Sequence, residues 1–224
     1  MSTREEKMTQ LLGLIENINT LHKIHSEEWL KNLHRTYNLK KTQVCDICIK
    51  EDESTSQNKI NLDFNFIIYM NEYCESLNKV YFHPFYDFLD LDSGFNVTTR
   101  IKDPDSRISK LWHYRLAKRE HGKVNVNKCL NDLMGFRILS DEFEHDESTI
   151  GELKLMLENS SVKVHNSCKG DYKATHVYFQ NGNNIYFPWE LQIWNTLDHD
   201  INIRSHAQHK QAYTKWPSIY IESV

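Results

Sequence analysis

The chain has 224 residues and a formal net charge of −4, with 39% hydrophobic and 12% aromatic residues, so it can bury a substantial core. Seven glycines and four prolines favour helices and strands over long loops. The longest apolar run, Phe66–Met70, is far too short to span a bilayer, and segment 1–10 is too polar for a signal peptide. Five cysteines without a targeting segment are typical of a reducing compartment, so we expect a cytoplasmic protein with no membrane partner.

Residues 1–60 are expected to form an N-terminal helical extension. Apolar residues recur at helical spacing from Met8 to Ile18, and Ser26, followed by two glutamates, is typical of a second helix start. Two interpretations stay open: the helices pack on the main domain, or they offer a basic surface to a partner or a nucleic acid. The basic residues are Lys23, Lys31, Arg35, Lys40 and Lys41. The CxxC pair Cys45 and Cys48 lacks the two further ligands of a structural zinc site, so we expect no metal there.

The remaining residues, 61–224, predict one domain with a mixed sheet. We expect a surface loop at 51–59, a buried helix at 62–81, a link at 87–94, a strand at 95–100 and a helix from Pro104 to about 120, capped near Asp105 or Ser106. The next elements expected are a strand at 134–139, an acidic loop at 141–147, a helix at 149–157 and a strand at 162–165. They are followed by a hairpin with arms 172–180 and 185–193 and by a helix at 197–213. Asn181-Gly182 is typical of a hairpin turn. This order predicts an α/β or α+β fold.

A basic stretch runs from Arg100 to Lys128. It holds nine lysines and arginines against three acids, Asp103, Asp105 and Glu120, in a chain that is acidic as a whole. Such a stretch forms either a solvated basic helix or a polyphosphate site. No glycine-rich phosphate loop is present, so a polyphosphate would have to be held by side chains.

Polar residues on the predicted hairpin favour the second interpretation. Residues two apart on a strand share a face, so Tyr172 and His176 point together from one arm, and Glu190 and Gln192 from the other. A carboxylate on a central strand is costly unless it is paired or bound to a metal. Together with Asp132, just before the strand at 134–139, Glu190 predicts a Mg²⁺-nucleotide site.

Four motifs, in this order, resemble the synthetase domain of RelA/SpoT-type enzymes over about 95–213. They are Arg100-x-Lys102-x-x-x-Ser106-x-x-x-Lys110, Asp132-Leu133-x-Gly135-x-Arg137-Ile138, Tyr172-x-x-x-His176 and Glu190-x-Gln192-Ile193. The resemblance implies a nucleotidyltransferase (polymerase β-like) fold, with a mixed β-sheet flanked by helices, and a pyrophosphokinase domain over 61–224. It also implies transfer of the β,γ-pyrophosphate of ATP to a ribose 3′-hydroxyl, with AMP as the leaving product.

For the ATP half of the site, the resemblance assigns five residues. Arg100 and Arg137 would sandwich the adenine through their planar guanidinium groups. Lys102, Ser106 and Lys110 would hold the phosphates. Three further cations could add charge but match no motif: Arg115, Lys118 and Arg119.

For the catalytic centre and the acceptor, the resemblance assigns another five residues. Asp132 and Glu190 would bind Mg²⁺, and Glu190 would also help to deprotonate the attacking hydroxyl. Tyr172 would stack on the base of the acceptor nucleotide. His176 and Gln192 would position the acceptor.

The acceptor half departs from the pattern of guanosine tetraphosphate synthetases. Such enzymes usually read Asn-Gly-Tyr where this chain has Gly170-Asp171-Tyr172, and Ile-Arg-Thr where it has Ile193-Trp194-Asn195. His199 stands where an asparagine is common. The chain is therefore more similar to the toxic small alarmone synthetases of bacterial or phage-encoded toxin–antitoxin and defence systems. The resemblance implies that the acceptor is the terminal adenosine of a tRNA CCA end, whose modification blocks aminoacylation and translation.

Several alternatives stay open. The acceptor could be GDP or GTP, as in (p)ppGpp synthetases, or an adenine nucleotide, and a tRNA end would need a local basic rim because the chain as a whole is acidic. Candidates for that rim are Lys23, Lys31, Arg35, Lys40, Lys41 and the cations from Arg115 to Arg119. An inactive homologue that serves as an interaction module is the non-enzymatic alternative. We further expect an antitoxin protein and homo-oligomerisation as partners.

Overall fold

A five-stranded mixed sheet organises the chain. In the computed structural model, the described residues are 4–31, 33–50, 60–84, 86, 94–117, 120–141 and 143–214. The strand order is β3-β4-β7-β6-β5. The strands are β3 (Thr98–Ile101), β4 (Met134–Leu139), β5 (Val162–Asn166), β6 (Thr175–Phe179) and β7 (Trp189–Trp194). Strands β4 and β7 are parallel, and the other neighbouring pairs of this sheet are antiparallel.

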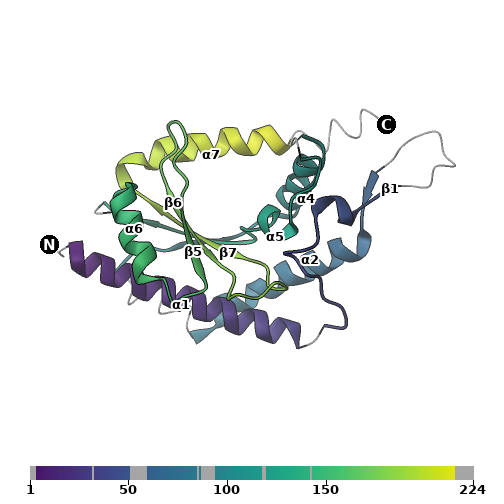
Figure 1. Ribbon diagram of the computed structural model, residues 1–224, viewed down its shortest axis with the longest axis horizontal. Coiled ribbons are helices and arrows are strands. Elements are labelled where there is room, and N and C mark those ends of the chain that lie inside the picture. The colour runs from purple at the N-terminus through teal and green to yellow at the C-terminus, as the bar shows by residue number, and fades with distance from the viewer. Residues whose placement is uncertain are drawn as a thin grey trace.

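Helices cover both faces of the sheet (Figure 1). Helix α1 (Arg4–Leu30) and helix α2 (Phe64–Ser76) lie on one side, and α7 (His199–Thr214) lies on the other. The remaining elements are α4 (Pro104–Trp112), α5 (Val126–Cys129), α6 (Glu147–Met156), the small hairpin β1 (Cys48–Lys50) and β2 (Ile60–Leu62), 3₁₀ turns at Val44–Ile47, Leu77–Phe82 and Thr196–Asp198, and a π turn at His113–Ala117. The predicted mixed sheet flanked by helices is confirmed.

The two faces of the sheet differ in polarity because side chains alternate along each strand. Leu191 and Ile193 of β7 belong to the apolar core that α1 closes with residues such as Leu14 and Ile18. Glu190, Gln192 and Trp194 point the other way, and all six residues of β7 are buried. A strand that is buried on both faces therefore carries a carboxylate and an amide under α7.

The elements around β4 agree closely with the sequence pattern. The strand at 134–139 is confirmed residue for residue. Asn181 and Gly182 both have positive φ (48° and 64°), and the Asn183 amide donates to the Gln180 carbonyl, as in a type I′ turn. The predicted turn is therefore confirmed. The second arm of the hairpin begins later than predicted, at Trp189, because Pro188 cannot donate to the ladder.

Two predicted helix starts are wrong. Helix α1 continues through Ser26, because His25 and Ser26 are buried and His25 Nε2 bonds Ser76 Oγ at 3.0 Å, so tertiary packing outweighs the local start signal. The cap of α4 is Asp103, not Asp105 or Ser106, because its carboxylate accepts from the Ser106 amide at 2.8 Å.

Some predictions lie outside the described residues. These are the loop at 51–59, most of the link at 87–94, and the cations Lys118 and Arg119. In the described part of the chain, no helix has the length and apolarity that crossing a membrane requires. The division into 1–60 and 61–224 stays a prediction, although α1 contributes directly to the core under the sheet.

Candidate active site

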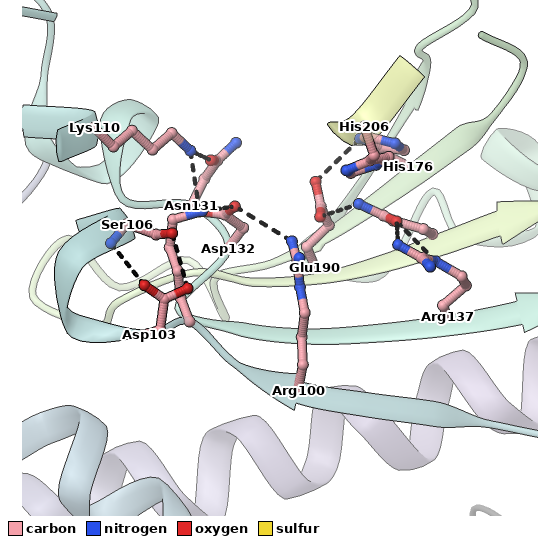
Figure 2. Close-up of polar contacts among 12 residues, drawn as sticks. Arg100, Asp103, Ser106, Lys110, Asn131, Asp132, Arg137, His176, Glu190 and His206 are labelled. Carbon is pink, nitrogen blue, oxygen red and sulfur yellow. Dashed lines mark hydrogen bonds and ion pairs between the residues drawn. The ribbon is translucent and has the colours of Figure 1, made fainter. Parts of the chain in front are cut away.

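Asp132 lies at the centre of a cluster of cations. Its Oδ2 accepts from Lys102 Nζ at 2.9 Å and its Oδ1 from Lys110 Nζ at 3.0 Å, while Arg100 Nη2 lies 3.9 Å from Oδ2. Figure 2 shows Arg100 rising between Asp132 and Glu190. Burial opposes ionisation, but Lys110 and Lys102 hold the pKa of Asp132 well below its usual range. Three cations face one carboxylate, which leaves an excess of positive charge for an anion.

Helix α4 explains how these cations come together. Lys102 directly precedes the Asp103 cap, and Ser106 and Lys110 follow at intervals of four, which places them on one face of the helix. Ser106 Oγ donates to Asp103 Oδ2 at 2.8 Å, and Lys110 also donates to Asn131 Oδ1 at 3.1 Å. Burial lowers the pKa of Lys102, although Asp132 opposes that shift. Of the predicted phosphate-binding residues, Ser106 and Lys110 therefore lie on α4 and Lys102 directly before its cap, with both lysines bonded to Asp132.

A slot lies between the two arginines on the polar face of the sheet. Arg100 on β3 pairs with Gly135 on β4, and Arg137 follows two residues later on the same face. A cavity of about 110 Å³ is lined there by Thr98, Thr99, Arg100, Gly135, Phe136, Arg137, Glu190 and Gln192. A Cβ at position 135 would lie in van der Waals contact with Arg100, 3.5 Å from its Nε, so glycine keeps this part of the slot clear of a second side chain.

Trp194 and Gln192 hold the Arg137 side chain in place. Its guanidinium lies 3.6 Å from the centroid of the Trp194 ring. It also donates to Gln192 Oε1 from Nε at 3.2 Å and from Nη2 at 3.0 Å. Because one planar face of the guanidinium rests on an indole, the other is free to stack in the slot.

Glu190 connects the slot to His176 and Tyr172. Its Oε2 accepts from Gln192 Nε2 at 2.7 Å, and its Oε1 lies 3.0 Å from His176 Nδ1. Burial alone would raise the pKa of Glu190, but His176 outweighs burial, so this pKa lies below its ordinary value. His176 Nε2 in turn lies 2.9 Å from the Tyr172 hydroxyl. The carboxylate is therefore ionised and held from both sides.

A larger pocket opens beside Tyr172. Its volume is about 660 Å³, and its lining residues are Ser167, Lys169, Gly170, Tyr172, His176, Ser205, His206 and Gln208. Burial raises the pKa of Tyr172 to about 12, so its hydroxyl stays protonated. We refer to this space as the Tyr172 pocket.

His206 belongs to this site and was not predicted. Its Nε2 lies 3.4 Å from the Tyr172 hydroxyl, and burial lowers its pKa to about 4, so the ring is neutral. Asn202 is fully buried and clamps α7 to Lys173, donating to its carbonyl at 2.8 Å and accepting from its amide at 3.0 Å. His199, Asn202 and His206 are spaced three and four apart, so they share a helix face, and this spacing was the available signal. His199 itself lies farther out, paired with Asp200.

The proposed basic rim stays a prediction, because two of its cations, Lys118 and Arg119, lie outside the described residues. Lys23 lies on α1, which covers the opposite face of the sheet from α7. Arg35 stacks on Tyr37, and Arg115 donates to the His121 carbonyl at 3.1 Å. Lys169, which lines the Tyr172 pocket, was not among the predicted rim residues.

The described residues contain no group of three or more His, Cys, Asp or Glu side chains placed to hold a metal. Cys45 and Cys48 are free thiols, and burial raises the pKa of Cys48 to about 11. Asp132 and Glu190 are two carboxylates, not three, so a cation between them would need oxygens from a substrate.

No protein-family model and no curated protein matches this sequence. Among solved structures, the chain is similar to the crystal structure of small alarmone synthetase 1 from Bacillus subtilis. The two are 16% identical, the match covers 70% of this chain and 90% of that chain, and the TM-score is 0.30. The same synthetase bound to AMPCPP is 17% identical over 70% of this chain and 89% of that chain, with a TM-score of 0.28.

Proposed function

We propose that this chain is an ATP-dependent pyrophosphotransferase. The observation that carries the proposal is Asp132, which lies among Arg100, Lys102 and Lys110 directly beside the two-arginine slot. A purine base in the slot would stack between Arg100 and Arg137, and its triphosphate would extend over the cations of α4. The arrangement fits a nucleoside triphosphate because Arg100 belongs both to the slot that would take the base and to the cluster of cations that would take the phosphates.

Mg²⁺ fits the residues present. Asp132 and Glu190 come from adjacent segments, both are buried, and both have lowered pKa values, so both are ionised oxygen ligands. Mg²⁺ prefers one or two carboxylates together with phosphate oxygens. When bound, it would neutralise charge that develops on the phosphoryl oxygens. In the complex, Lys102 and Lys110 would donate to triphosphate oxygens in place of Asp132. The carboxylate oxygens of Asp132 would then be available to bind the metal.

The residues of the chain then have separable tasks. Lys102, Ser106 and Lys110 hold the triphosphate in line with the acceptor. The acceptor hydroxyl oxygen bonds to the β-phosphorus, the bond between that phosphorus and the α,β-bridging oxygen breaks, and AMP leaves. The hydroxyl proton passes to Glu190, which His176 and Gln192 keep in place.

We propose further that the acceptor is the 3′-terminal adenosine of tRNA. Lys169 is the one lysine or arginine among the described residues that line the Tyr172 pocket. Of the two histidines that line it, His206 is neutral and His176 is paired with Glu190. GDP and GTP carry several negative charges and call for several cations, whereas an RNA 3′ end brings one phosphodiester to the same place. Tyr172 would stack on the terminal base. Modification of this hydroxyl would block aminoacylation, so the activity would be toxic and an antitoxin partner is expected.

The test uses ATP labelled at the γ-phosphate with deacylated tRNA, AMP, GDP or GTP as acceptors. Label should appear on tRNA, and Asp132→Asn and Glu190→Gln should each lose about 10²- to 10³-fold in rate, a magnitude typical of lost electrostatic stabilisation. Glu158→Gln is the matched control because Glu158 is exposed and lies outside the site. Label only on GDP or GTP would assign the chain to (p)ppGpp synthesis instead, and no transfer to any acceptor would favour an inactive interaction module.

A further inference from the structure

A second groove lies on the other side of the turn that carries Tyr172. Its volume is about 520 Å³, and its lining residues are Phe143, Glu144, His145, Asp146, Cys168, Lys169, Gly170, Lys173, Asn195 and Asp198. Neither the slot nor the Tyr172 pocket accounts for this space. We refer to it as the His145 groove.

The His145 groove and the Tyr172 pocket share one wall. Lys169 and Gly170 line both spaces. They belong to a tight turn in which the Lys169 amide donates to the Tyr172 carbonyl at 2.8 Å and the Tyr172 amide donates back at 3.2 Å. Gly170 has a φ of 58°, which suits glycine at this sharp reversal. The exposed Lys169 therefore lies between the His145 groove and the Tyr172 pocket.

The groove suits a base and not a second phosphate. Three carboxylates line it against two lysines, and Lys173 is already paired with Asp198 at 3.4 Å. Such a lining disfavours an additional phosphate but supplies acceptors for the exocyclic amines of a base. The buried ring of Phe143 packs against His145, with ring centroids 5.6 Å apart, and provides an aromatic floor.

His145 adds an unused polar atom at this place. Its Nδ1 lies 2.9 Å from Thr175 Oγ1, whereas its Nε2 is buried without a hydrogen-bond partner. Burial lowers the pKa of His145, so the neutral ring offers one donor and one acceptor. A buried ring nitrogen without a partner is costly unless a ligand or water satisfies it.

We propose that the His145 groove is the subsite for the penultimate nucleotide of an RNA acceptor, with Lys169 binding the phosphodiester that joins it to the terminal nucleotide. Two base-sized spaces with one cation between them match a dinucleotide. The proposal rests on the proposed function and extends it, because it makes the acceptor a chain of at least two nucleotides and not a free mononucleotide.

The first test compares AMP with the dinucleotide CpA as acceptors for labelled pyrophosphate. The kcat/KM for CpA should exceed that for AMP by about tenfold, as stacking of the additional base in the His145 groove would give. Lys169→Ala should lower the kcat/KM for CpA and for AMP alike, because both carry a phosphate on the 5′-oxygen of the adenosine, while the KM for ATP stays unchanged. Lys163→Ala is the matched control, because Lys163 is exposed on β5 and lines neither space.

The second test does not depend on catalysis. Cys168 is exposed and lines the groove, so the trinucleotide CCA should slow its alkylation by N-ethylmaleimide several-fold, as measured by mass spectrometry of the Cys168 peptide. AMP should give no such protection. Cys45, which is partly exposed and lies outside both spaces, is the internal reference.

The two tests separate the possible failures. Protection of Cys168 by CCA without any transfer would support the subsite and contradict the proposed function. Transfer to tRNA with equal use of AMP and CpA, and with no protection, would overturn the subsite and leave the proposed function standing. Transfer to GDP alone, again without protection, would overturn both.

Discussion

The Arg137 guanidinium lies 3.6 Å above the centroid of the Trp194 ring. Trp194 also makes an edge contact with Tyr172, at 6.1 Å between centroids and 88° between planes. One buried indole therefore supports both the arginine of the two-arginine slot and the tyrosine of the Tyr172 pocket. Under the proposed function, Trp194 would act through these neighbours as a positioning residue.

The first prediction concerns this indole. Trp194→Phe keeps an aromatic ring but weakens the support of Arg137, so the KM for ATP should rise about two- to tenfold, as expected for loss of a cation–π contact. The kcat should stay within about twofold, because Asp132 and Glu190 are untouched. Steady-state kinetics with varied ATP would measure both constants.

Trp189→Phe is the matched control. Trp189 lies on the opposite face of β7, against His22, and donates to the Tyr73 hydroxyl at 2.7 Å. This variant should lower the thermal unfolding midpoint while leaving the KM for ATP unchanged. Equal effects of the two variants on that KM would mean that Trp194 acts only through stability.

The second prediction concerns the floor of the slot. Gly135→Ala places a methyl group 3.5 Å from Arg100 Nε, an ordinary contact that the fold tolerates. The methyl group occupies space that a stacked base needs, so affinity for ATP should fall about tenfold. Binding of a fluorescent ATP analogue would measure this loss directly.

Gly151→Ala on α6 is its control, because a Cβ there meets nothing within 4 Å. Both alanines should raise unfolding free energy by about 0.5–1 kcal/mol, since glycine is unfavourable inside a helix or strand. Unchanged ATP affinity in Gly135→Ala would contradict the assignment of the slot to the base.

The parts of the fold that follow from local pattern could be predicted from the sequence. Strand β4 is an apolar run with clear limits, and Asn181-Gly182 requires the positive φ values of a type I′ turn. The local sequence could not show that no new helix starts at Ser26. Helix α1 continues there because His25 and Ser26 are buried against α2.

The site shows the same division. The period of two along β7 correctly places Glu190 and Gln192 on one face. The role of His206 depends on where α7 crosses the sheet, and no local pattern fixes that crossing. The His145 groove could not be predicted from the sequence either, because its walls come from three separate segments, at 143–146, 168–173 and 195–198.

The third prediction separates the ring of Tyr172 from its hydroxyl. Tyr172→Ala should lower kcat/KM for the acceptor about 10- to 100-fold, because base stacking is worth about 1–3 kcal/mol. Tyr172→Phe keeps the ring and loses only the hydroxyl contacts with His176 and His206, so it should retain most of the activity. Circular dichroism would confirm that both variants fold, and near-normal turnover by Tyr172→Ala would contradict the stacking role.

The last prediction concerns stability in acid, and it arises from two buried histidines on α1. His22 Nε2 donates to the Phe187 carbonyl at 3.0 Å, and His22 Nδ1 accepts from the side-chain Nδ2 of Asn181. Both ring nitrogens of the neutral imidazole therefore have a hydrogen-bond partner. Burial lowers the pKa values of His22 and His25 to about 4, from 6.5 in the unfolded chain.

The direction in which stability changes with pH follows from proton binding in the folded and unfolded states. Between pH 6.5 and 4 the unfolded chain binds protons at these rings and the folded chain does not, so stability is fully present above pH 6.5 and falls as the pH decreases. Each ring should cost about 1.4 kcal/mol per pH unit within this window. Unfolding midpoints in urea at pH 7.5, 6.0 and 5.0 would measure the slope. His22→Gln should flatten it, whereas His34→Gln, an exposed control, should leave it unchanged. A slope that is the same in all three proteins would show that His22 is not the group that titrates.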